Sequence, residues 1–331
     1  MIFIINYIRN MIAIIAGCEP ERPLLFSYYV THRCNLNCRY CSDGSGEKFS
    51  NDKVEELKTD DAKNLISIMS HSSDTLDITG GEPLLRSDLA ELLAHAKKSG
   101  MRTVLNTKGI GLEKRPDVIK NSDVIVISID SLDAGRLSEL TGGAHSHLNT
   151  LEYLVNNRSK IKSSIIISSV ATPSNLSDIS EILDYVEQHD LSFHISPEIV
   201  GTKANPELMN NPEYEKLIDE ILRRKRRGEG ILGVRKYLHA IRDFSDGPCN
   251  PLLMPVIRPD GALYYPCLER KRADVNLLES GDYFKAMEEA RNLGGPLPDC
   301  KGECHIFCHM GLSLFQRHPL DAIRESKYWR T

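Results

Sequence analysis

Short hydrophobic runs alternate with helical patterns from Leu25 onward. The runs are rich in β-branched and aromatic residues, which predicts buried strands, and capping residues or glycines bound the helical stretches between them. Strand and helix in repeated alternation indicate a parallel α/β sheet. Six such units are too few for a closed eight-stranded barrel and enough for an open, partial (βα)6 barrel. The predicted strands are Leu25–Thr31, Thr75–Thr79, Arg102–Asn106, Val124–Ile129, Ile165–Ser169 and Leu191–Ile195.

The N-terminal segment is strongly apolar, but Asn6, Arg9 and Asn10 share one side of a projected helix. Residues 1–17 are too short to span a bilayer comfortably. Such a helix suits either an anchor that lies along a membrane surface or a helix packed on the protein's own core. Residues 15–18 resemble a lipoprotein processing site, but no positive charge precedes the apolar run, as a signal peptide requires. We therefore expect a separate N-terminal amphipathic helix in residues 1–22.

The pattern changes after the sixth predicted strand. A connection that contains Pro and Asn runs to Pro212, and a helix with the basic run Arg223–Arg227 near its end follows. Further on, Pro259-Asp260-Gly261 between two β-rich runs predicts a hairpin. We expect a barrel core in residues 23–212, linking helices in 213–245, and a small cysteine-rich domain in 246–331.

Composition is that of a globular protein, with 41% hydrophobic and 26% charged residues in 331. The net charge of −5 gives no global reason to expect nucleic acid as a partner. The nine cysteines fall into groups of three and five, with Cys18 alone, which in a long chain is typical of metal ligation rather than of disulfides. We expect a cytoplasmic location, with peripheral contact to the inner face of the membrane through residues 1–17 as the alternative to core packing. The run Arg223–Arg227 would favour anionic lipid.

Three cysteines follow the first predicted strand with C-x3-C-x2-C spacing: Cys34, Cys38 and Cys41. Three thiolates so close in sequence can converge on one iron–sulfur cluster, and they leave one iron of a [4Fe–4S] cluster open to another ligand. Zinc is the alternative metal, but zinc ribbons pair C-x2-C with a second cysteine or histidine pair, and the sequence near Cys41 has none. The spacing by itself indicates only a three-thiolate site.

These cysteines, with Tyr40 before the third, resemble the signature of the radical S-adenosylmethionine superfamily. The resemblance implies a [4Fe–4S] cluster whose open iron binds the amino and carboxylate groups of S-adenosylmethionine. It also implies a reductant such as flavodoxin or ferredoxin. One electron would cleave the cofactor to methionine and a 5′-deoxyadenosyl radical, which abstracts a hydrogen atom from a substrate.

The resemblance extends to the ends of the next three strands. Gly80–Pro83 is similar to the family motif whose backbone meets the cofactor's amino group, and barrel sites form at this end of the strands; an ordinary β-turn is the alternative. Many relatives carry an Arg shortly before a Gly beyond the fourth strand. Here that place reads Ser138–Gly142, with Arg136 earlier, so the partner of the cofactor's carboxylate stays open. The implied cofactor contacts are Gly80, Gly81, Glu82, Pro83, Asn106, Ser128 and Asp130.

The C-terminal cysteines resemble the SPASM/twitch extension that holds auxiliary iron–sulfur clusters. Five thiolates complete one four-cysteine cluster and leave one over, so we expect one auxiliary [4Fe–4S] cluster held by four of the five. A structural zinc site is the alternative, because His305 and His309 lie beside two of these cysteines. The five are Cys249, Cys267, Cys300, Cys304 and Cys308.

The resulting hypothesis is a radical S-adenosylmethionine enzyme. Relatives with this extension commonly modify peptides or proteins, which makes such a substrate the default. A lipid or isoprenoid substrate is the first alternative, motivated by residues 1–17 and Arg223–Arg227. A scaffold that binds iron–sulfur or zinc without chemistry is the second. The sequence leaves open whether the cofactor is consumed or recycled, and the oligomeric state.

Overall fold

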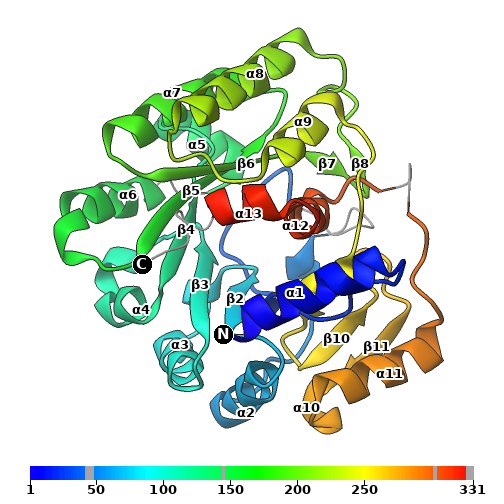
Figure 1. The fold of residues 1–331 in the computed structure, drawn as a ribbon. Coiled ribbons are helices and arrows are strands. Elements are labelled where there is room, and N and C mark those ends of the chain that lie inside the picture. The colour runs from blue at the N-terminus through cyan, green and yellow to red at the C-terminus, as the bar shows by residue number, and fades with distance from the viewer. Residues whose placement is uncertain (42–47, 144–145, 301–303, 326–331) are drawn as a thin grey trace.

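The computed structural model describes residues 1–41, 48–143, 146–300 and 304–325, and a single large sheet organises them (Figure 1). Within these residues the sheet has nine strands in the order β11-β10-β9-β1-β2-β3-β4-β5-β6. All pairs from β1 to β6 are parallel and follow chain order. These strands are β1 (Phe26–Thr31), β2 (Thr75–Gly80), β3 (Arg102–Thr107), β4 (Val124–Ser128), β5 (Ser164–Ala171) and β6 (Ser192–Pro197). The predicted α/β class and open six-strand barrel are confirmed.

Helices connect successive parallel strands and cover the outer face of the sheet. They are α2 (Thr59–Ser70), α3 (Leu89–Lys98), α4 (Pro116–Asn121), α5 (Ala134–Thr141), α6 (His147–Asn156) and α7 (Leu176–Gln188). After β6 the chain continues into α8 (Pro212–Arg227) and α9 (Arg235–Asp243). Short 3₁₀ turns occur at Phe49–Asn51, Pro83–Leu85, Leu112–Lys114, Arg158–Lys160 and Pro251–Leu253. Burial alternates along β2: Leu76 and Ile78 are fully buried, whereas Asp77 and Thr79, which follow each of them, stay partly accessible. The inner face of the sheet therefore remains open to a ligand.

The C-terminal segment continues the barrel sheet past its first strand. β9 (Val256–Ile257) pairs in parallel with β1, and β10 (Ala262–Tyr265) and β11 (Ala273–Asn276) add on in antiparallel fashion. The predicted turn at Pro259–Gly261 joins β9 to β10. A separate small hairpin consists of β7 (Ile199–Val200) and β8 (Lys203–Ala204). The remaining helices are α1 (Ile2–Ile15), α10 (Leu277–Ser280), α11 (Tyr283–Gly294), α12 (Phe307–Arg317) and α13 (Pro319–Glu325). The domain boundaries drawn from the sequence stay predictions.

Helix α1 packs on the body of the protein through its polar side. The Asn6 side-chain amide donates to the carbonyl oxygens of Pro23 and Ser72, at 2.8 and 2.7 Å. The Asn10 amide donates to the Arg22 carbonyl at 2.8 Å and its oxygen accepts from the Arg22 N–H at 3.1 Å. Of the two predicted arrangements, packing on the protein is therefore the one observed. No helix in the described part of the chain is long and apolar enough to cross a membrane.

Replacement of Asn6 by Ala should lower the free energy of unfolding by about 1–3 kcal/mol, because two buried carbonyl oxygens lose their donor. Chemical denaturation of the full chain measures this change. The matched control is Ile8→Ala on the exposed side of the same helix, which should change the value by at most about 0.5 kcal/mol. Equal stability of the Asn6 variant and the wild type would show that α1 does not dock as described.

Candidate functional site

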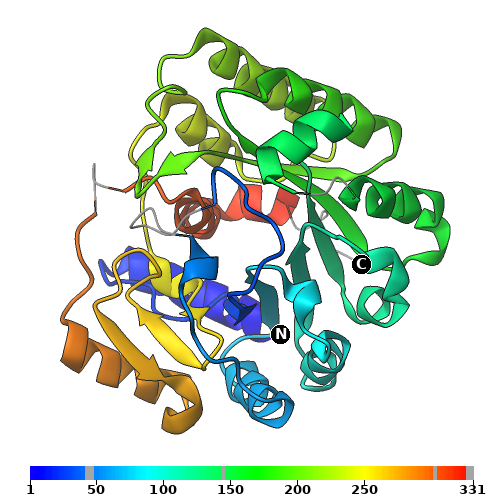
Figure 2. The same cartoon turned by 180° about the vertical axis from the view of Figure 1, so that it is seen from behind.

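The three cysteines of the C-x3-C-x2-C motif lie on the loop that leaves the carboxyl end of β1. Two backbone hydrogen bonds tie this loop to the end of α5, from Asn37 N to Thr141 O at 2.9 Å and from Arg39 N to Leu140 O at 3.3 Å. Figure 2 shows the loop in front of the sheet, with α1 behind it. The loop therefore occupies the end of the barrel where the parallel strands finish.

The three thiols lie near enough to influence one another. Burial raises the pKa of Cys41 to about 11, and the thiolates of Cys38 and Cys34 contribute to the rise. Burial and the Cys38 thiolate also raise the pKa of Cys34. Three mutually repelling thiolates need a positive group between them, which an iron–sulfur cluster supplies. The donor set therefore fits the implied cluster.

Two consecutive glycines allow β2 to end directly against the start of the cysteine loop. A Cβ atom built on Gly80, whose φ is +130°, would lie 2.2 Å from the Thr31 carbonyl oxygen, and one on Gly81 would lie 2.1 Å from that of Arg33. The Gly81 and Glu82 N–H groups donate to the same two oxygens, both at 2.8 Å. Only residues without a side chain permit this approach. The motif is thus more than an ordinary turn, because it joins the ends of two strands.

Glu82 braces the end of β2 against the end of β3. One carboxylate oxygen accepts from the Leu84 N–H at 3.0 Å and from the Thr107 hydroxyl at 2.5 Å, and the other accepts from the Lys108 N–H at 2.9 Å. Burial raises the pKa of this carboxyl, and these hydrogen bonds oppose the rise. The Glu82 side chain therefore fixes the ends of β2 and β3 relative to each other.

A buried ion pair adjoins the cysteine loop. The Lys108 ammonium lies 2.6 Å from the Asp130 carboxylate and 2.8 Å from the Tyr40 hydroxyl, and that hydroxyl also donates to Asp130. The second Asp130 oxygen accepts from the Val170 N–H at 2.9 Å. Burial alone would lower the pKa of Lys108, but the Asp130 carboxylate and the Cys38 thiolate raise it above its usual value. No motif in the sequence points to Lys108, although a lysine directly after a predicted strand end is a visible signal.

The structure brings the implied cofactor contacts to one end of the barrel but gives them different roles. The Asn106 amide donates to the Asp77 carboxylate on the inner face, and the Ser27 hydroxyl donates to the same carboxylate at 3.1 Å. Ser128 ends β4 opposite Ser168. Asn106 is therefore engaged by a neighbouring strand, and Asp77 is a polar group that the sequence did not single out.

Further titratable groups face the inner side of the sheet. Burial raises the pKa of Asp77 to about 6 and lowers that of His194 to about 4. His194 Nδ1 lies 3.2 Å from the Ser168 hydroxyl. Cys308, at the start of α12, belongs to the same surroundings: burial, Glu269 and Asp77 raise the pKa of its thiol to about 11. The Cys308 side chain nevertheless stays accessible.

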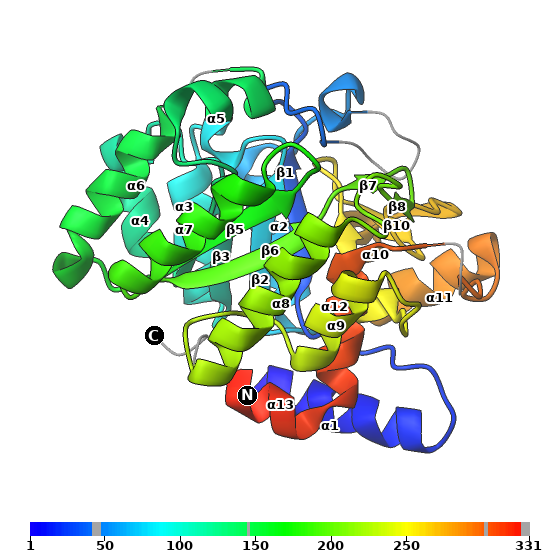
Figure 3. The same cartoon turned by 90° about the horizontal axis from the view of Figure 1, so that it is seen from above.

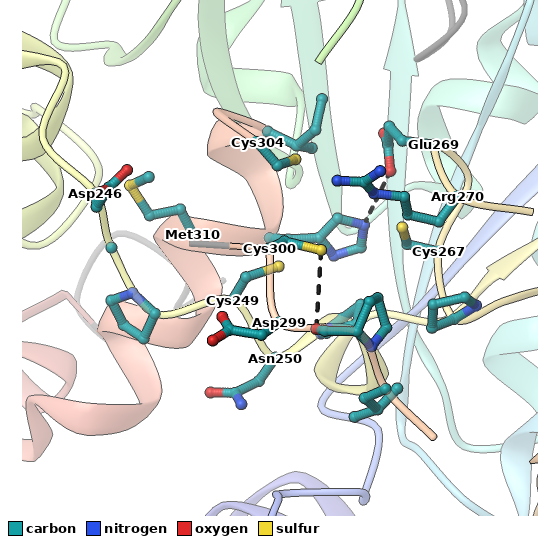
Figure 4. A pocket seen from close by; sticks show the side chains of 18 of the residues that line it. Asp246, Cys249, Asn250, Cys267, Glu269, Arg270, Asp299, Cys300, Cys304 and Met310 are labelled. Atoms are coloured by element: carbon teal, nitrogen blue, oxygen red, sulfur yellow. Dashed lines mark hydrogen bonds and ion pairs between the residues drawn. The ribbon is translucent and has the colours of Figure 1, made fainter. Parts of the chain in front are cut away.

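Four of the five C-terminal cysteines line one cavity of about 780 Å³ (Figure 4). Glu269, Arg270 and His309 line it as well, and Cys308 is not among its lining residues. Burial and the thiolates of Cys304 and Cys300 raise the pKa of Cys249 to about 12. Among the described residues, no three His, Cys, Asp or Glu side chains converge on the position of a single metal ion. The four cysteines are Cys249, Cys267, Cys300 and Cys304.

Comparison with known proteins agrees with this geometry. Residues 28–186 match the model of the Radical SAM superfamily. These residues form a radical SAM domain. Fe-coproporphyrin III synthase of Methanosarcina barkeri is 29% identical over 221 residues, which cover 63% of this chain and 53% of that protein. GTP 3′,8-cyclase of Helicobacter pylori is 30% identical over 184 residues, with 53% and 56% covered. The chain thus spans about half the length of the curated relatives it matches.

A solved structure shares the fold of this radical SAM protein. Streptococcus suis SuiB bound to S-adenosylmethionine superimposes with a TM-score of 0.64 at 17% identity, covering 87% of this chain and 70% of that one. SuiB bound to its precursor peptide SuiA gives a TM-score of 0.63 at 16% identity, covering 82% and 66%. At these identities the likeness shows the fold alone. The superfamily implies a [4Fe–4S] cluster and S-adenosylmethionine as cofactors.

Replacement of Asp77 by Asn should stabilise the protein at pH 8 and lose that effect as the pH falls. In the folded protein the pKa of Asp77 is raised from 3.8 to about 6, so its ionised form costs stability above that pH and costs nothing once the group is protonated in both states. Because the carboxylate is partly accessible, we expect a gain of about 1–2 kcal/mol at pH 8. Unfolding under anaerobic conditions at pH 8, 6 and 4 measures the difference, because the cost disappears between the folded-state pKa of about 6 and the ordinary value of 3.8. A gain that is the same at pH 8 and pH 4 would contradict the assignment.

Proposed function

We propose that this protein is a radical SAM enzyme that abstracts a hydrogen atom from a peptide or protein substrate. The observation that carries the proposal is the placement of three thiols at the carboxyl end of β1, beside the open inner face of the barrel. Polar side chains line that face, among them Asp77, Asn106 and His194. A substrate on the inner face would therefore lie next to the cofactor bound at the cysteine loop.

In this proposal Cys34, Cys38 and Cys41 hold the [4Fe–4S] cluster. When bound, the cluster supplies the electron that cleaves S-adenosylmethionine and so generates the 5′-deoxyadenosyl radical. Gly80 and Gly81 leave room for the cofactor's amino group against the end of β2, and Glu82 holds that end in place. The chain's contribution is to bind and orient the cofactor and to keep water away from it.

Lys108 is our candidate for the cation that meets the cofactor's carboxylate. The sequence lacks the usual family Arg, and Arg136 is directed elsewhere: it donates to the Ser174 carbonyl and lies 3.5 Å from the Asp178 carboxylate. Lys108 instead lies beside Tyr40 in the cysteine loop, and its ammonium stays charged through Asp130. Asp130 and Ser128 then border the same cofactor position from β4.

The peptide substrate is supported by the shared fold with SuiB, which has been solved with its precursor peptide. The named relatives GTP 3′,8-cyclase and Fe-coproporphyrin III synthase act in other chemistry, so this part of the proposal rests on the fold. A lipid substrate finds no support at the site, because its inner face is polar. An exposed apolar side belongs to α1, and that helix lies at the other end of the barrel (Figure 3).

We also propose that the four-cysteine cavity holds one auxiliary [4Fe–4S] cluster. Its thiols come from the two ends of the β9–β10 hairpin region and from the segment before α12, and its volume exceeds the need of a single zinc ion. Cys308 is the cysteine left over. An auxiliary cluster there would lie behind the inner face of the barrel, near Glu269, whose charge acts on both Cys267 and Cys308.

The triple variant Cys34→Ala, Cys38→Ala, Cys41→Ala should produce no 5′-deoxyadenosine when the reconstituted protein receives S-adenosylmethionine and reductant anaerobically. The reason is that the cofactor loses its iron ligand and its electron donor. Chromatography of the products measures this, and the wild type is the control. Product formation by the triple variant would refute radical chemistry at this loop, and its absence from the wild type would favour a scaffold.

Iron counting distinguishes the auxiliary ligands. In the background of the triple variant, about four irons per chain should remain. A further Cys249→Ala change should remove most of this iron, whereas Cys308→Ala should leave it unchanged, because Cys308 lies outside the cavity. Equal losses in both variants would contradict the assigned ligand set, and bound zinc in place of iron would favour the zinc alternative.

A further inference from the structure

The outward side of α1 is apolar along its whole length. A helix on the surface of a globular protein normally turns its apolar side to the core. Here the polar residues Asn6 and Asn10 are buried, at 3% and 1% exposure, while Ile12 and Ile15 are 61% and 79% exposed. An exposed apolar strip of this kind is typical of a surface that binds another protein or a membrane. The exposed apolar residues of α1 are Met1, Ile4, Ile5, Ile8, Ile12 and Ile15.

Helix α13 extends this apolar surface. α1 is fixed to α12 by hydrogen bonds from the Tyr7 hydroxyl to the Phe315 carbonyl and from the Gln316 amide to the Tyr7 carbonyl, both 3.0 Å. α13 follows α12 directly and exposes Leu320 and Ile323, at 72% and 68%. Figures 1 and 3 agree that α1 and α13 lie on the same face of the molecule. We call the exposed apolar residues of both helices the α1–α13 face.

Arginines border the α1–α13 face. Arg9 is exposed and, at 100° per residue, lies at the edge of the outward side of α1. Arg324 is exposed on α13 and lies 3.0 Å from the Asp321 carboxylate, whereas Arg317 lines the four-cysteine cavity and donates to the Asn250 side-chain oxygen at 3.3 Å. Arg9 forms no ion pair with any residue that the structure describes. Arg9 therefore brings an unneutralised positive charge to the border of the face.

The end of α8 adds more positive charge. The Lys225 ammonium lies 2.6 Å from the Glu325 carboxylate, which brings the last turn of α8 against the end of α13. Arg226 and Arg227 are exposed there, and Arg227 lies 2.9 Å from the Glu229 carboxylate. Arg224 has a different role, because it is 7% exposed. It forms ion pairs with Asp184, Glu187, Glu220 and Glu229.

We propose that the α1–α13 face lies on an anionic lipid bilayer. The isoleucines would enter the boundary between headgroups and acyl chains, and the arginines would lie at the level of the phosphates. A second copy of the chain fits this face less well. A two-fold contact sets the same patch of each copy against the other, so the second copy would bring the same positive charges and no anionic surface. An anionic surface complements them instead.

A membrane bound at the α1–α13 face would also orient the protein. Figure 3 shows α1 and α13 along one edge of the molecule and α5, to which the cysteine loop is bonded, along the opposite edge. On a membrane, the open end of the barrel would face the aqueous side. A substrate would then arrive from solution, and the membrane would set location rather than supply the reactant. This inference does not depend on the reaction proposed above.

Flotation of the full chain with vesicles tests the proposal. Wild-type protein should float with vesicles of phosphatidylcholine and phosphatidylglycerol and bind much less to phosphatidylcholine alone. The variant Ile8→Ser with Ile12→Ser should bind about tenfold less or weaker still, since two side chains leave the apolar contact. The matched control is Val200→Ser with Met209→Ser, two exposed apolar residues that follow β6 at the other end of the sheet. The control should bind as the wild type does.

Other outcomes overturn the proposal. Wild-type protein that stays in solution with anionic vesicles would refute it, as would equal binding by the Ile8/Ile12 variant. If light scattering shows a wild-type dimer that the same variant converts to a monomer, the occupant of the face is a second copy. Formation of 5′-deoxyadenosine without vesicles should be unchanged in the variant, so failure of the membrane proposal and failure of the proposed reaction can be told apart.

Discussion

The close approach of β2 to the start of the cysteine loop is the contact on which the candidate site depends. The carbonyl oxygens of Thr31 and Arg33 accept hydrogen bonds from the backbone N–H groups of Gly81 and Glu82. A Cβ atom on Gly80 or Gly81 would collide with these oxygens. The contact sets two motifs, far apart in the chain, side by side at one end of the barrel. The Glu82 carboxylate also accepts a hydrogen bond from the Lys108 N–H, which ties the end of β2 to the end of β3.

β1 is central to the molecule because it pairs on both sides. On one side β2 continues the barrel, and on the other β9 begins the C-terminal extension. The cysteine loop and the four-cysteine cavity are therefore attached to one continuous sheet. Asp77 on β2 and Glu269 after β10 both raise the pKa of the Cys308 thiol. Groups that the sequence separates into two regions thus share one interior.

The two ends of the barrel differ in the groups they leave accessible. At the carboxyl end the inner face is polar and holds an ion pair between Lys108 and Asp130. At the opposite end α1 buries its asparagines and exposes its isoleucines. At the carboxyl end, Lys108 and Asp130 neutralise each other, as buried charges require. At the opposite end, the exposed apolar side of α1 is typical of a surface that binds another molecule.

The sequence by itself predicted the alternating strands and helices of a parallel α/β sheet, and it grouped three cysteines after the first strand. These features are local: hydrophobic periodicity, spacing and backbone freedom can be read along the chain. Tertiary structure decided the rest. Amphipathicity divides α1 into two sides without specifying which one faces the protein, and the carbonyl groups of Pro23, Arg22 and Ser72 decided that. The sequence does not reveal which of the five C-terminal cysteines lies outside the shared cavity. In the structure it is Cys308, which lies in the first turn of α12. Asp77 and His194 became site candidates only because the curved sheet turns their side chains to one interior.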